Sequence, residues 1–158
     1  MTTRKCLTIL PLGLILLGPR VAIADCNDDA RIRVVKGDTQ KAENLYGPIM
    51  GKFPSWDKNF HEEQFTYIGS LQNGIEVGLL YTSWGVSTCR GTTRLMLFRK
   101  AKYIGCYSDP VDGAIKLAGN KILFPYPADW GNVIDLSGPI PHEILLGGQL
   151  LTFMPAGS

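Results

Sequence analysis

The chain from residue 60 onward alternates short apolar runs with dipeptides that favour tight turns. The clearest example is Asn73-Gly74, which separates the runs 65–72 and 75–84, both rich in aliphatic and aromatic residues. Asn and Gly tolerate the positive φ angles of a two-residue type I′ turn, and such runs are typical of β-strands. The pattern predicts a β-hairpin in which Gln72 lies opposite Ile75.

Two later dipeptides predict hairpins by the same reasoning. Gly119-Asn120 suits a type II′ turn, and Gly147-Gly148 suits another two-residue turn. Closing each turn aligns apolar side chains across the two strands, which is how paired strands stabilise each other. The aligned pairs are Leu117 with Ile122, Ile115 with Phe124, Leu145 with Leu150, and Ile144 with Leu151.

Four further runs, at 31–35, 92–99, 102–108 and 132–137, raise the count to about ten strands joined mostly by tight turns. Residues 95–98 have no polar break, which is typical of a strand that is buried on both faces. We therefore expect an all-β, mostly antiparallel fold, either a β-sandwich or a small barrel built from consecutive hairpins.

The segment near residues 38–60 departs from this pattern. Asp38 is a suitable N-cap for a helix that would run to about Tyr46, and Gly47-Pro48 would end it. We expect a short helical or irregular segment here. Stretches rich in proline and glycine at 125–131 and 138–141 predict two loops.

The first 24 residues have the pattern of a cleavable signal peptide. Arg4 and Lys5 precede an apolar run at 7–17, and Ala22-Ile23-Ala24 is a small-x-small cleavage site. The apolar run has about half of the roughly 20 residues that a membrane-spanning helix needs. We expect residues 25–158 to form a single exported β-domain, periplasmic or secreted, with no integral membrane segment after cleavage.

Removal of the signal peptide changes the charge of the chain. Arg4, Lys5 and Arg20 are three of its 16 basic residues, whereas all 14 acidic residues lie beyond residue 24, so the net charge falls from +2 to −1. A nearly neutral chain without a block of basic residues lacks the electrostatic surface that nucleic acid or anionic lipid requires. We expect neither as a partner.

The cysteines fit an exported protein. Cys6 would leave with the signal peptide, and Cys26, Cys89 and Cys106 would remain. We expect a disulfide between Cys89 and Cys106, because both lie in or beside predicted strands and close a short loop, with Cys26 left unpaired. The large charged Asp25 before Cys26 disfavours lipoprotein processing.

No arrangement of residues predicts a catalytic, metal or cofactor site. His61 and His142 lack the helical i, i+4 spacing of a zinc-protease motif, and the adjacent carboxylates of Glu62-Glu63 point apart in an extended chain. A composite site containing both histidines stays open, because only the fold would bring them together.

The loops carry the residue types that dominate protein-binding hot spots. Trp84 ends a predicted strand, Arg90 follows Cys89, and Tyr126 and Trp130 lie in the proline-rich loop 125–131. These four residues are the candidate binding-loop residues.

The sequence favours a non-enzymatic exported binding protein that acts on a protein or ligand in the cell envelope, such as an inhibitor or an immunity-type protein. One alternative is a carrier of a small apolar ligand inside a closed β-barrel. A second alternative is an envelope hydrolase with a composite site of histidines and carboxylates.

Overall fold

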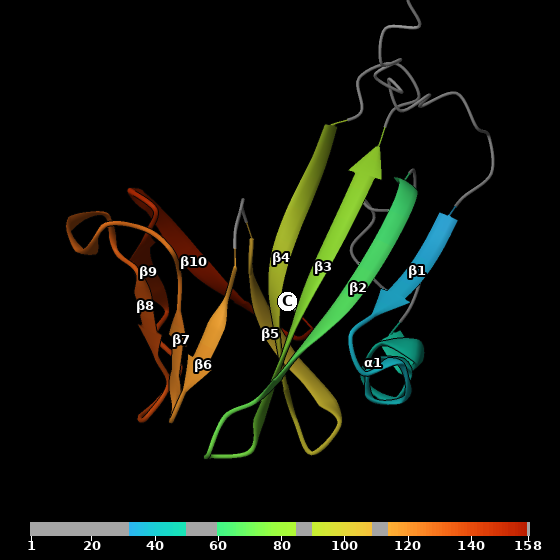
Figure 1. Ribbon diagram of the computed structural model, residues 1–158, viewed down its shortest axis with the longest axis horizontal. Helices are drawn as coiled ribbons and strands as arrows, with labels where there is room; N and C mark the ends of the chain where they lie inside the picture. Colours follow the sequence, from blue (N-terminus) through green and yellow to red (C-terminus); the bar gives the residue numbers. More distant parts are fainter. Residues whose placement is uncertain (1–31, 50–59, 85–89, 109–113, 158) are drawn as a thin grey trace, which may run out of the picture.

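The computed structural model describes residues 32–49, 60–84, 90–108 and 114–157, which contain ten strands and one α-helix (Figure 1). The first half comprises β1 (Ile32–Lys36), α1 (Thr39–Tyr46), the 3-10 turn η1 (Gly47–Ile49), β2 (Phe60–Ser70), β3 (Ile75–Trp84), β4 (Arg90–Arg99) and β5 (Lys102–Ser108). The second half comprises β6 (Lys116–Ala118), β7 (Lys121–Leu123), the 3-10 turn η3 (Ala128–Trp130), β8 (Val133–Asp135), β9 (Glu143–Leu146) and β10 (Gln149–Pro155).

The strands form two sheets that pack against each other. The larger sheet has seven strands in the order β1-β2-β3-β4-β5-β10-β9, and the smaller has three in the order β6-β7-β8. All pairings are antiparallel except the one between β1 and β2. The predicted all-β, mostly antiparallel class is confirmed, and the architecture is the sandwich alternative.

The small barrel is the alternative that the structure does not form, because the described strands do not close into a barrel. The larger sheet ends at β9, where Gly131, between η3 and β8, lies against the carbonyl oxygen of Leu145. The contact covers the Leu145 carbonyl, a hydrogen-bond acceptor with which a strand closing the sheet into a barrel would have to pair.

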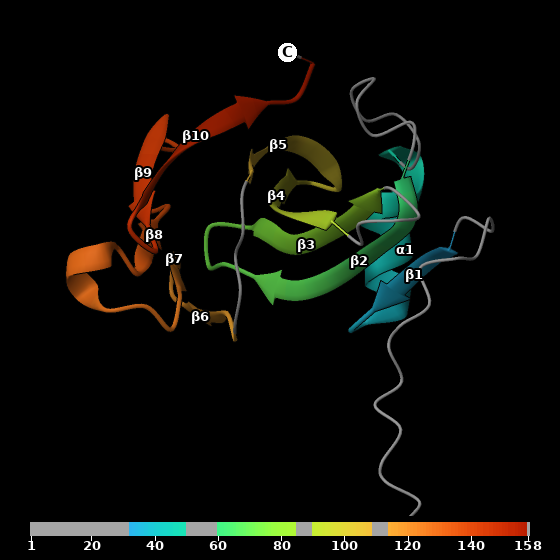
Figure 2. The same ribbon diagram turned by 90° about the horizontal axis from the view of Figure 1, so that it is seen from above.

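Strand β4 supplies side chains to two separate cores. Leu95 and Leu97 point into the first core, between the two sheets, whereas Met96 and Phe98 point into the second core, beneath α1. All four side chains are fully buried, as the unbroken apolar run predicts. At β4 the larger sheet is therefore covered on both faces, by the smaller sheet on one side and by helix α1 on the other (Figure 2).

Helix α1 has the predicted bounds and the predicted cap. The Asp38 side chain accepts a hydrogen bond from the Lys41 backbone N–H at 3.0 Å. Its apolar side, Ala42, Leu45 and Tyr46, is buried in the second core, where Tyr46 stacks on Phe65 with ring centroids 4.7 Å apart.

The β2–β3 hairpin is present, but its predicted type I′ turn and register are wrong. Only Gly74 in the turn has a positive φ, and the Leu71 N–H donates to the Ile75 carbonyl at 2.8 Å, so the loop has three residues. The side chain of Asn73 explains the difference, because its Oδ1 accepts from the Ile75 N–H and its Nδ2 donates to the Leu136 carbonyl. A bulge between Tyr67 and Gly69 shifts the register further.

The other two glycine turns have three of the four predicted pairings, and the fourth, Ile115 with Phe124, lies beyond the paired residues of β6 and β7. Leu117 lies opposite Ile122, Leu145 lies opposite Leu150, and Ile144 lies opposite Leu151. The β4–β5 turn reaches a similar geometry without glycine, since Lys100 and Ala101 have φ angles of 51° and 59°.

Two predictions fall largely on residues outside the described ranges. The predicted signal peptide, residues 1–24, lies outside these ranges, and so do two of the three cysteines of the predicted mature chain, Cys26 and Cys89. Cys106 is buried in β5 on the side of the second core. The signal peptide and the Cys89–Cys106 disulfide therefore stay predictions.

Candidate functional site

The four candidate binding-loop residues lie in two separate places. Trp84 and Arg90 are cross-strand partners at the ends of β3 and β4, in the larger sheet. Tyr126 precedes η3 and Trp130 is its last residue, and η3 lies far from the ends of β3 and β4 in both views (Figures 1 and 2). The structure thus brings the four together as two pairs and not as one site.

Tyr126 anchors its loop to the fold. Its half-buried ring stacks on Phe124 with centroids 6.2 Å apart and packs against the first core. A Cβ added at Gly147 would lie 3.2 Å from this ring, so the β9–β10 turn also packs closely on it. Most of the Tyr126 ring is therefore used for packing within the fold.

Trp130, in contrast, is 54% exposed although its backbone is fixed. Its carbonyl accepts a hydrogen bond from the Gly148 N–H at 2.6 Å, and the carbonyl of Gly131 accepts one from the Gly147 N–H at 3.0 Å. These two hydrogen bonds fasten the end of η3 to the β9–β10 turn. The exposed indole is thus held on a rigid support.

Two further apolar side chains are exposed beside this turn. Leu145 and Leu150 are cross-strand partners, with exposed fractions of 47% and 66%. Their chain neighbours Leu146 and Leu151 point into the first core. Side chains alternate along a strand, so Leu145 and Leu150 lie on the opposite face of the hairpin. We call Trp130, Leu145 and Leu150 the β9–β10 apolar surface.

The position of α1 explains why this face is open. Leu150 shares its face of β10 with Met154, which packs against the second core. Helix α1 covers that face of the sheet at the β1–β2 end, and β9 and β10 lie at the other end (Figure 2). The sequence predicts Leu145 and Leu150 only as an aligned pair, since nothing in the pattern says which face of the hairpin is covered.

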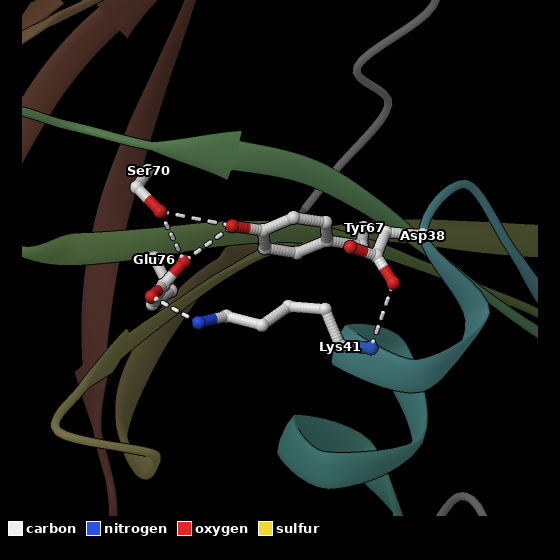
Figure 3. Close-up of polar contacts among 5 residues, drawn as sticks. All are labelled: Asp38, Lys41, Tyr67, Ser70 and Glu76. Carbon is white, nitrogen blue, oxygen red and sulfur yellow. Dashed lines mark hydrogen bonds and ion pairs between the residues drawn. The ribbon is translucent and has the colours of Figure 1, made fainter.

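A cluster of polar side chains lies on the same face of the sheet, close to α1 (Figure 3). The carboxylate of Glu76 in β3 accepts hydrogen bonds from the hydroxyls of Tyr67 and Ser70 in β2 and pairs with the Lys41 ammonium of α1 at 2.9 Å. The Tyr67 and Ser70 hydroxyls are also 2.9 Å apart. The cluster fastens α1 to the β2–β3 hairpin.

The electrostatics of the cluster agree with a fastening role. Burial opposes ionisation of Glu76, but hydrogen bonds from Ser70, Tyr67 and Lys41 outweigh it and hold the pKa of Glu76 below its usual value. The hydrogen bond and charge of Glu76 raise the pKa of Lys41. Burial, together with the hydrogen bond to Glu76, raises the pKa of Tyr67. At neutral pH, Tyr67 is therefore a hydrogen-bond donor to an ionised carboxylate.

A second polar group is fully inside the fold. The Arg94 side chain has no exposed surface, and its Nη1 donates to the Thr82 Oγ1 at 2.8 Å. Glu63, opposite Thr82 in β2, is also buried. A buried guanidinium is rare and fixes the packing of neighbouring strands more than it offers a surface for binding.

The structure does not bring the two histidines together. His61 lies in β2 and His142 lies just before β9, and four strands separate β2 from β9 in the sheet. His142 is exposed, and its backbone carbonyl accepts a hydrogen bond from the Phe153 N–H. In the described ranges, no group of three His, Cys, Asp or Glu side chains could hold a metal ion.

The one α-helix of the described residues is too short to cross a membrane, and no described helix meets the length and apolarity that a span requires. No protein-family model matches this chain, and neither the curated proteins nor the solved structures contain a match to it. The exposed β9–β10 apolar surface is the feature of the described structure that most resembles a binding site.

Proposed function

We propose that this protein is an exported, non-catalytic binding domain whose β9–β10 apolar surface docks a protein partner in the cell envelope, as an inhibitor or immunity-type protein does. The observation that carries the proposal is the exposure of Trp130, Leu145 and Leu150 around one turn. Exposed groups of large apolar side chains on a folded domain usually mark interaction sites, and Trp is one of the residues enriched in binding hot spots.

Rigidity supports this interpretation. The turn that carries the surface is hydrogen-bonded to Trp130 and Gly131, and Leu145 and Leu150 lie on paired strands. A surface that is already ordered loses little conformational entropy on binding. Burial of its apolar side chains can therefore contribute to the free energy of binding with little offset.

A protein partner suits this surface better than a small apolar ligand. Small ligands bind in enclosed concave sites. Here the exposed side chains lie on a hairpin, and the interior between the two sheets is occupied by buried side chains such as Leu97, Ile122 and Ile134. The described strands also lack the closed barrel on which a carrier would depend.

Affinity capture from an envelope extract of the source cells tests the proposal. The bait proteins are the wild type, Leu150→Ser and Val133→Ser. Val133 is the matched control, because it is also an exposed apolar residue but lies on β8, next to Ile134, which points into the first core. Its side chain therefore lies on the outer face of the other sheet.

We expect one or more proteins to be captured by the wild type and by Val133→Ser and to be lost with Leu150→Ser. Equal capture by all three baits would contradict the proposal. Circular dichroism of each bait establishes that it is folded.

A further inference from the structure

The C-terminal part of the chain contains carboxylates but no Lys or Arg. Lys121 is the last Lys or Arg in the sequence, and residues 122–158 contain Asp129, Asp135, Glu143 and one histidine, His142. This segment forms β8, β9, β10 and η3, which include the whole β9–β10 apolar surface.

One of the three acidic residues is neutralised within the fold. Asp135 pairs with Lys121 across β7 and β8 at 3.2 Å. Hydrogen bonds from Ser137, followed by the pairing with Lys121, lower the pKa of Asp135 to about 2. Among the described residues of this segment, Asp129 and Glu143 remain as the exposed, unpaired carboxylates.

Both remaining carboxylates border the β9–β10 apolar surface. Asp129 lies in η3, immediately before Trp130. Glu143 is two residues before Leu145 in β9, so their side chains share the open face of the hairpin. The surface is thus an apolar centre with an acidic rim.

We infer that the partner docked by this surface presents apolar side chains bordered by Lys or Arg. This inference rests on the proposed function and names the chemistry of the partner. Basic groups opposite Asp129 and Glu143 would gain attraction and speed encounter, whereas acidic groups there would repel. An anionic lipid or a nucleic acid would bring its phosphates against the same two carboxylates.

The same rim argues against a second copy of this chain as the occupant. A two-fold dimer places the same patch of both copies in contact. It would bring Asp129 and Glu143 of each copy together, with no Lys or Arg in residues 122–158 to compensate them.

A random peptide library displayed on phage tests the inference on the full protein. Selections are made in parallel on the wild type, Leu150→Ser, the double variant Asp129→Asn/Glu143→Gln, and Glu43→Gln. Glu43 is the matched control, because it is an exposed carboxylate on α1, at the other end of the sheet.

We expect peptides that require Leu150 and are enriched in Lys and Arg beside aliphatic or aromatic residues. The enrichment should persist with Glu43→Gln and disappear with the double variant. For one selected peptide, replacing its basic residues by Gln should raise the Kd for the wild type at least tenfold at low salt. The difference should shrink near about 0.5 M NaCl, because salt screens exposed charges.

Two outcomes separate the inference from the proposed function. Peptides that require Leu150 but show no basic enrichment would overturn the inference and leave the binding surface intact. A selection with no peptide that requires Leu150 would contradict both. Sedimentation velocity adds a third outcome, since a dimer that Leu150→Ser dissolves would identify the occupant as a second copy and overturn the inference.

Discussion

At the scale of single residues, the β4–β5 turn carries unrelieved backbone strain. Lys100 and Ala101 both have positive φ angles, although neither is Gly, Asn or Asp. The left-handed conformation costs an L-residue about 1–2 kcal/mol, which cross-strand pairing of β4 and β5 must offset.

Replacing Ala101 by Gly should remove part of this cost. We expect Ala101→Gly to raise the free energy of unfolding by about 1 kcal/mol, after allowance for the greater entropy of Gly in the unfolded chain. Urea denaturation measures the change. Ala118→Gly, in strand β6 without a positive φ, is the control and should lower stability by roughly 0.5–1 kcal/mol. A loss of stability in both variants would refute the strain at Ala101.

The Glu76 cluster predicts a pH dependence at the same scale. The pKa of Glu76 is lower in the folded protein than in the unfolded chain. The ionised carboxylate therefore stabilises the fold at pH values above its unfolded pKa. This stabilisation is lost as the pH falls through the folded-state pKa. We expect the wild type to lose stability below about pH 4.5 more steeply than Glu76→Gln. Denaturant melts at several pH values measure this. Parallel pH profiles for the two proteins would show that the cluster does not stabilise the fold.

At the scale of elements, local pattern and turn chemistry predicted most hairpins but not all of their details. The turns at Gly119-Asn120 and Gly147-Gly148 have the expected pairings in β6–β7 and β9–β10, because glycine-containing dipeptides favour two-residue hairpin turns. Asn73 instead contacts Ile75 and the distant Leu136, and these contacts select a three-residue loop. Contacts between distant parts of the chain are not visible in a local pattern.

The candidate site was predictable only in part for a related reason. Trp130 was identified because Trp in a proline-rich loop is a common binding residue. Leu145 and Leu150 were identified as an aligned pair, but their exposure depends on where α1 covers the sheet. The packing role of Tyr126 depends on its stacking with Phe124 and on the approach of the distant Gly147, and the sequence pattern shows neither contact.

The contact between η3 and the β9–β10 turn depends on Gly131. Its φ is 76°, and an added Cβ would lie 2.0 Å from the Leu145 carbonyl oxygen, so the loop would have to move. We expect Gly131→Ala to lower the free energy of unfolding by about 1–3 kcal/mol, the usual cost of such strain. Gly138→Ala is the control, because Gly138 has no atom within 4 Å of an added Cβ and no positive φ. Equal stability of the two variants would contradict this account of the loop.

At the scale of the whole molecule, export and oxidation remain predictions that chemistry can test directly. Protein purified from the envelope of the source cells should begin at Asp25, and non-reducing peptide mapping should link Cys89 to Cys106. Intact mass spectrometry would contradict export if Met1 were retained. A peptide that links Cys26 to either other cysteine would contradict the pairing and would tie the N-terminus to the sheet.

One face of the larger sheet is packed against α1 at one end and exposed to solvent at the other. At one end, α1 and the Glu76 cluster close the face, and at the other end β9 and β10 leave it open. The fold is stabilised by two cores, so exposure of Leu145 and Leu150 does not remove an essential part of either. A stable domain can therefore present this surface to a partner.

The most direct test of this account is the affinity of the captured envelope partner for Trp130→Ala, measured by isothermal titration calorimetry beside a thermal melt. Trp130 is more than half exposed, so its removal should leave Tm nearly unchanged. We expect binding to weaken by about 2 kcal/mol or more, roughly 30-fold, as for a hot-spot residue. A folded Trp130→Ala protein that binds the partner as tightly as the wild type does would contradict the assignment of the β9–β10 apolar surface as the binding site.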